Sequence, residues 1–141
     1  MVSAAPLRRE FPNGLAELPA VRADLRVWLD QAVDDESARD DLVLAGTELV
    51  ADVARHDGPG VIRLQAWAEE RTVVVEISGP ARPAAPVRVV LDLDDSTWVR
   101  DAGMRILQGL CDEVAVSTEP DLRRVQCRKN VSGTRGRWAS A

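Results

Sequence analysis

"DDLVLAGTELVADVARH", residues 40–56, is the stretch of sequence that decides the fold. Its apolar residues recur at the spacing of one helix face, at Leu42, Ala45, Leu49 and Val53. Glu48 and Asp52 lie four residues apart on the same helix, where two carboxylates repel each other by a few tenths of a kcal/mol. The pair therefore indicates either a face that meets a cation or the remnant of a site that once did.

The polar stripe of this helix continues through Arg55 and His56. One interpretation is a network within the helix, in which Arg55 bridges Asp52 and His56 caps the C-terminal end. The other is a mononuclear metal site built from Glu48, Asp52 and His56. The network is preferred, because no further metal ligand is evident elsewhere in the sequence.

Two more helices are predicted, one on each side of this central helix. Helical spacing of apolar residues predicts the first over 15–32, with Pro19 tolerated in its first turn. Ser37, with Asp40 three residues on, predicts the start of the central helix, which the Gly and Pro residues of 56–60 end. The third helix is predicted to start at Trp98 or Val99 and to reach Leu110, with Thr97 as its N-cap.

The segments rich in β-branched residues predict strands. Strands are expected over 6–12, 61–68, 72–78, 113–118 and 123–131, and residues 87–94 are either a strand or an ordered part of the loop that precedes them. The resulting order is that of an α+β two-layer sandwich, with a mixed, mostly antiparallel sheet covered on one face by about three helices. We expect one domain over residues 1–131 and a basic, flexible tail over 132–141.

The composition is that of a soluble globular protein. The chain has 141 residues, 45% of them hydrophobic and 29% charged, and its net charge is −5. It has neither an apolar run long enough for a membrane span nor the apolar core of a signal peptide at its N-terminus, so we expect a cytoplasmic location. Cys111 and Cys127 have no metal-binding or redox spacing, and are expected to be buried free thiols, with a disulfide as the alternative.

Charge is distributed unevenly along the chain, although its net value argues against direct nucleic-acid binding. Residues 34–41 hold five acids against Arg39, whereas residues 122–141 hold no acid and six bases, Arg123, Arg124, Arg128, Lys129, Arg135 and Arg137. Solvated faces explain this pattern most simply, and a charged surface that docks a protein partner is the alternative.

Four segments, taken in order, resemble one known family. They are "RREFP" (8–12) with the helix after it, the stretch 40–56, "VVVEIS" (73–78) and "GMRILQGLCDEVAV" (103–116). From about Arg8 to Val131 the chain resembles the Bergerat-type fold of histidine-kinase and Hsp90-like ATPases. The resemblance is to their small branch, the anti-sigma-factor serine kinases, which sequester sigma factors and phosphorylate anti-anti-sigma partners.

The resemblance implies a four-part Mg-ATP site, whose first two parts are altered here. Glu48 matches the family's catalytic base, and Asp52 stands where an Asn would ligate Mg²⁺. An Asp can bind a hard cation, yet its charge would repel phosphate oxygens by about 4 kcal/mol at 4 Å and an effective dielectric constant near 20. The carboxylate that reads adenine is replaced by Gly79, or by Ser78 if the register slips by one.

The other two parts bind phosphate in the family. The glycine-rich loop that opens the third helix matches Asp101 and Gly103, so an acid replaces its first glycine. A helix start at Trp98 would also use up the amides that should face phosphate. Near the start of the last strand the family's Thr is missing, and Arg123 or Arg124 could attract phosphate only as a point charge.

These departures predict a regulatory protein that acts by protein–protein binding and whose nucleotide site has degenerated. The resemblance implies a sigma factor or an anti-anti-sigma protein as partner, and a homodimer. One alternative is an active ATP-dependent serine kinase that uses Glu48 as base and Asp52 on Mg²⁺. Another is a different ligand in the former nucleotide pocket.

Overall fold

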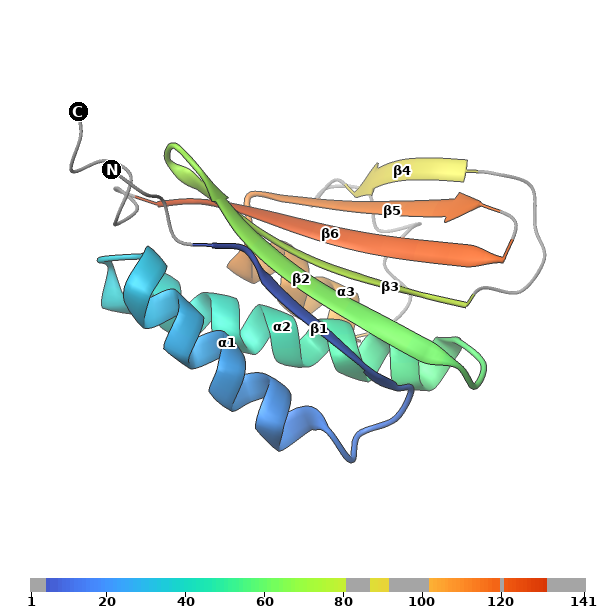
Figure 1. Ribbon diagram of the computed structural model, residues 1–141. Helices are drawn as coiled ribbons and strands as arrows, with labels where there is room; N and C mark the ends of the chain where they lie inside the picture. Colours follow the sequence, from blue (N-terminus) through green and yellow to red (C-terminus); the bar gives the residue numbers. More distant parts are fainter. Residues whose placement is uncertain (1–4, 81–86, 92–101, 120, 132–141) are drawn as a thin grey trace.

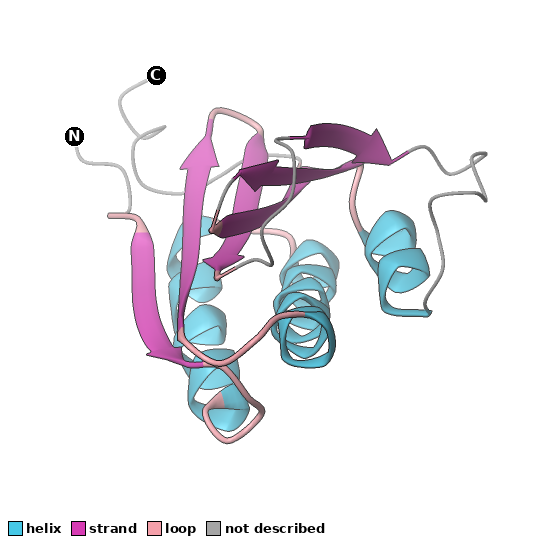
Figure 2. Cartoon of the chain, turned by 90° about the vertical axis from the view of Figure 1, so that its right-hand side faces the viewer, coloured by secondary structure: helices cyan, strands magenta, loops and turns pink. Residues whose placement is uncertain are grey.

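The computed structural model describes residues 5–80, 87–91, 102–119 and 121–131. It is a two-layer sandwich in which three helices lie against one face of a six-stranded sheet (Figure 1). The strand order is β1-β2-β3-β6-β5-β4. Figure 2 shows the sheet end-on, with all three helices on the same side of it.

The predicted fold class is confirmed, and each strand pairing is antiparallel. The strands are β1 (Leu7–Pro12), β2 (Val61–Glu69), β3 (Thr72–Gly79), β4 (Val87–Leu91), β5 (Glu113–Glu119) and β6 (Leu122–Asn130). The helices are α1 (Leu18–Ala32), α2 (Glu36–His56) and α3 (Ala102–Leu110). Residues 87–91 are therefore a strand, and not merely part of a loop.

The hydrophobic core lies between the sheet and the helix layer. On β2, β3 and β6 alternate residues are fully buried because they face the helices, as strand geometry requires. These residues are Ile62, Leu64, Ala66, Val73, Val75, Ile77, Val125 and Cys127. The opposite face of the sheet has no helix over it and carries mostly polar residues.

The central helix α2 contacts both other helices and the sheet. Its predicted apolar face is confirmed, since Leu42, Ala45, Leu49 and Val53 are all buried. Gly46 allows α1 to approach closely, because a Cβ atom there would lie 2.5 Å from Cδ2 of Leu25. No helix in the described parts of the chain is long and apolar enough to cross a membrane.

Two predicted helix starts differ from the structure. Helix α1 begins at Leu18 rather than Leu15, so Pro19 lies in its first turn, where its missing N–H breaks no helical hydrogen bond. Helix α2 is capped by Asp35 and not by Ser37, because Asp35 Oδ1 accepts from the backbone N–H groups of Ser37 and Ala38 at 3.0 and 3.3 Å. The predicted start of the third helix lies outside the described residues.

The C-terminal end of α2 is held by Asn13, from the turn after β1. Its side-chain amide donates to the carbonyl oxygens of Val53, Asp57 and Gly58 at 3.2, 3.2 and 2.9 Å. The Val53 carbonyl also accepts the helical hydrogen bond of the Asp57 N–H, while Asp57 and Gly58 lie just beyond the helix, where carbonyls lack a helical partner. In the sequence, Asn13 and Gly14 together indicate only a turn.

Replacing Asp35 by Ala removes the N-cap of α2. We expect D35A to lower the free energy of unfolding by about 1 kcal/mol, the usual cost of losing such a cap. The matched control is S37A, which should change it by less than about 0.5 kcal/mol because the Ser37 side chain is exposed and is not the cap. Urea denaturation of both variants measures the difference, and an equal loss in the two would contradict the assignment.

Candidate functional site

Three segments far apart in the sequence meet where the C-terminal half of α2 lies against the sheet. They are α2 itself, the end of β3 and the start of β6 (Figure 1). The register pairs Gly79 of β3 with Arg123 of β6. Arg123 faces the helices, where its guanidinium group reaches Asp52 near the end of α2 and Asp57 just beyond it.

The guanidinium group of Arg123 makes two ion pairs at this point. Nη2 lies 2.9 Å from Oδ2 of Asp52, and Nη1 lies 3.3 Å from Oδ1 of Asp57. The three side chains are only 1%, 4% and 17% exposed for Asp52, Asp57 and Arg123. Charges so deeply buried are tolerated when they are paired and hydrogen-bonded, so Arg123 compensates both carboxylates.

This arrangement changes the interpretation of the acidic face of α2. The sequence suggested Arg55 or a metal ion as the cation that meets Asp52. The structure brings a cation to Asp52 from β6, 71 residues further along the chain. Among the described residues, no group of three or more His, Cys, Asp or Glu side chains could hold a metal ion. The His56 side chain lies outside the described part.

The end of β3 is packed tightly against the core. Gly79 is buried, and a Cβ atom there would lie 2.3 Å from Cδ1 of Ile62 and 3.9 Å from Cγ1 of Val53. Real Cβ contacts are never so short, so any side chain at this position must displace Ile62. Position 79 is one of the two that match the family's adenine-binding carboxylate. The space that a side chain would need there is already filled by Ile62.

Two other predicted site residues lie in the helices, Glu48 in α2 and Gly103 in α3. Glu48 lies one turn before Asp52 on α2 and is half-buried. Gly103 is in the first turn of α3, which packs against α2. Asp101 lies outside the described residues.

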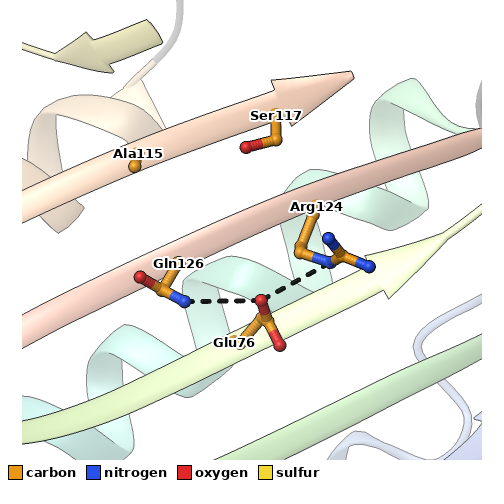
Figure 3. Close-up of a pocket in the computed structure, with 5 residues that line it drawn as sticks. All are labelled: Glu76, Ala115, Ser117, Arg124 and Gln126. Atoms are coloured by element: carbon orange, nitrogen blue, oxygen red, sulfur yellow. Dashed lines mark hydrogen bonds and ion pairs between the residues drawn. The ribbon is translucent and has the colours of Figure 1, made fainter. Parts of the chain in front are cut away.

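Ser78 and Arg124, in contrast, do not join Asp52. They are register partners on the sheet face away from the helices, because neighbouring strand residues point to opposite faces. Arg124 Nε lies 3.6 Å from Oε1 of Glu76, and Gln126 donates to the same oxygen at 3.4 Å. Figure 3 shows Glu76, Arg124 and Gln126 on this face, with the helices behind the sheet. Together with Ala115 and Ser117 they line a pocket of about 210 Å³. Ser78 and Arg124, both predicted as site residues, therefore lie on the opposite face of the sheet from Asp52.

The sequence missed two features of this region. Arg123 and Arg124 were both candidates in the sequence, and only the β3–β6 register shows that Arg123 is the one that faces the helices. Asp57, in the predicted helix stop, was not recognised as a second acid of the cluster. The turn signal Asn13–Gly14 was the only local hint of the residue that fixes this end of α2.

A protein-family model, that of the histidine kinase-like ATPase domain, matches residues 11–129 of the sequence. The chain belongs to this family. No curated protein matches it. The match spans every region discussed above, from Phe11 in β1 to Lys129 in β6.

A histidine kinase-like ATPase domain is expected to bind Mg-ATP. Two positions of the implied site, Asp52 and Gly79, show whether the residues of this chain suit that ligand. Asp52, at the position of the magnesium ligand, is instead neutralised by Arg123. Gly79, at the position of the adenine reader, has no side chain and no space for one beside Ile62. These residues do not fit the ligand, because a metal would have to displace a buried guanidinium group and adenine would lose its carboxylate partner.

Removing the Arg123 guanidinium group should strongly destabilise the fold. We expect R123M to lower the free energy of unfolding by about 3 to 5 kcal/mol, because two buried carboxylates lose their countercharge. The matched control is R26M, which breaks the ion pair of Arg26 with Asp40, whose side chains are 52% and 60% exposed, and should cost at most about 1 kcal/mol. Similar midpoints for the two variants in urea would contradict the role given to Arg123.

The tight packing at Gly79 can be measured by a double-mutant cycle. We expect G79A to cost about 1 to 3 kcal/mol, the usual cost of overpacking, because the added methyl group meets Cδ1 of Ile62. I62V removes that carbon atom, so the cost of G79A should fall by about 1 kcal/mol in the I62V background. G58A is the control, since a Cβ atom there meets nothing within 4 Å. Additive costs for Gly79 and Ile62 would refute the contact.

Proposed function

We propose that this histidine kinase-like ATPase domain is an anti-sigma-factor-like regulator that acts by binding a protein partner and has lost nucleotide binding. A sigma factor, an anti-anti-sigma protein or both would be the partner, in a switch that controls transcription. Homodimerisation in the cytoplasm is part of the same proposal. The branch of the family that the sequence resembles motivates the choice of partner.

The observation that carries the loss of nucleotide binding is the ion pair of Arg123 with Asp52. In a working site the residue at position 52 must present an oxygen to a metal ion that bridges the phosphates. Here that oxygen is 2.9 Å from a guanidinium nitrogen, within a cluster that also engages Asp57. The cluster links α2 to β6. Asp52, whose position in the family serves to bind Mg²⁺, is here part of a structural contact.

An active serine kinase is the second candidate, and one observation favours it. Glu48 is retained on α2, half-buried and one turn from Asp52, as the family's base would be. Phosphoryl transfer depends on metal and phosphates being positioned together. The kinase would therefore require Arg123 to leave Asp52, which makes it the weaker candidate.

The two candidates differ in their response to nucleotide. We expect no change in melting temperature with millimolar Mg-ATP or Mg-ADP, because no site is left to bind them. A nucleotide present at 100 times its dissociation constant would stabilise the fold by about 2.7 kcal/mol, a shift that thermal denaturation detects easily. A clear shift would contradict the proposal and favour the kinase.

The partner is tested by binding measurements on the same protein. Candidate sigma factors and anti-anti-sigma proteins of the host, purified separately, should include at least one that binds with equal affinity with and without Mg-ATP. E48Q serves as the control variant, since it would abolish kinase turnover but should leave this binding unchanged. Binding that requires nucleotide, or no binding to any candidate, would count against the proposed role.

A further inference from the structure

The pocket on the sheet face without helices is built from three neighbouring strands, β3, β6 and β5. The strand registers explain why its five residues gather. Gln126 lies between Glu76 and Ala115 across the sheet, and Arg124 lies beside Ser117. All five belong to strands, so their backbone positions are fixed by the sheet itself.

The hollow results from the different lengths of the side chains on β5 and β6. Ala115 and Ser117 of β5 are short, whereas their register partners Gln126 and Arg124 are long. Both long side chains turn away from β5 toward Glu76 on β3, which they approach at 3.4 and 3.6 Å (Figure 3). Space is therefore left above the two short residues, and its walls are polar.

Glu76 supplies the acceptor side of the pocket. It is buried, with 9% of its surface exposed, although it lies on the sheet face without helices. Arg124 Nε and Gln126 Nε2 both approach its Oε1 atom, and Oε2 makes no hydrogen bond or ion pair to another described residue. A carboxylate can accept about four hydrogen bonds, so Glu76 can still accept from a ligand that carries a positive charge.

Arg124 and Ser117 supply the donor side of the pocket. Arg124 approaches Glu76 through Nε, which orients the guanidinium group and leaves its two Nη groups for another partner. Two parallel N–H groups of this kind bind a carboxylate in a bidentate manner. The Arg124 side chain is 41% exposed, so these groups can be reached from solvent. The Ser117 hydroxyl, on the neighbouring strand, is a further donor.

We propose that this pocket binds a small free α-amino acid in its zwitterionic form. The ligand carboxylate accepts from the Nη groups of Arg124 and the hydroxyl of Ser117, and the ligand ammonium group donates to the carboxylate of Glu76 and the amide oxygen of Gln126. One acid and one base line the pocket, so its net charge is zero, like that of the ligand. Its volume of about 210 Å³ is below the roughly 300 to 1,000 Å³ of drug-sized sites, which favours glycine, alanine or serine. The pocket and Asp52 lie on opposite faces of the sheet, so this proposal does not depend on the loss of nucleotide binding.

The experiment titrates the isotope-labelled, full-length chain with L-alanine and follows its amide signals by NMR. We expect saturable shifts of the Gln126 side-chain amide and of backbone amides in β5 and β6, with a dissociation constant of about 10 mM or tighter. N-acetyl-L-alanine lacks the ammonium charge and L-alaninamide lacks the carboxylate, so each should bind at least about tenfold more weakly. Equal binding of either analogue, or no saturable shift with about 50 mM L-alanine, would overturn the proposal.

Single variants assign the two charges of the pocket. E76Q and R124Q should each weaken the binding of L-alanine at least about tenfold, because each removes the partner of one ligand charge. R128Q is the matched control and should change the affinity by less than about twofold, since Arg128 lies on the same strand and face but pairs with Glu69 outside the pocket. Equal losses in R124Q and R128Q would refute the assignment. If E76Q or R124Q fails to fold, the two analogues decide on the wild-type chain.

Discussion

The ion pair between Asp52 and Arg123 joins the central helix to the sheet inside the core, and much of the structure around it follows from that contact. Charges this deeply buried stay ionised only when a partner of opposite sign lies within hydrogen-bonding distance. The register of β3 with β6 must therefore place Arg123 beside Gly79, facing α2. At the same end, Asn13 holds the last carbonyls of α2, so this end of the helix is fixed from two directions.

Strand β6 makes contact with the helix layer along its whole length. Its helix-facing residues alternate as Arg123, Val125, Cys127 and Lys129. Arg123 pairs with Asp52 near the end of α2, and Lys129 pairs with Asp41 near its start at 3.2 Å. Between them Val125 and Cys127 are buried in the core. The same strand also reaches α3, since the Lys129 ammonium group donates to the carbonyl oxygen of Leu110 at 2.8 Å.

The ion pair of Asp52 with Arg123 gives a physical reason for the proposed loss of nucleotide binding. A family member that binds Mg-ATP must keep the position of Asp52 open toward a ligand. In this chain the same position contributes to the stability of the folded protein through Arg123. The two uses compete, because a metal ion on Asp52 would have to lie beside the buried guanidinium group of Arg123, a second cation. Arg124, the next residue along β6, has a different surrounding. It lies on the polar face of the sheet, where it pairs with Glu76.

The sequence by itself determined the elements and their order. Apolar spacing identified α2 and its buried face, and the β-branched segments marked the strands to within one residue at most ends. Helix caps were less secure, because Asp35 and Ser37 are both good N-cap residues and only the backbone geometry chooses between them. What only the tertiary structure decided was the partner of Asp52 and the space at Gly79. Both depend on which residues far apart in the chain come into contact, and the periodicity within one segment does not name its partners in another.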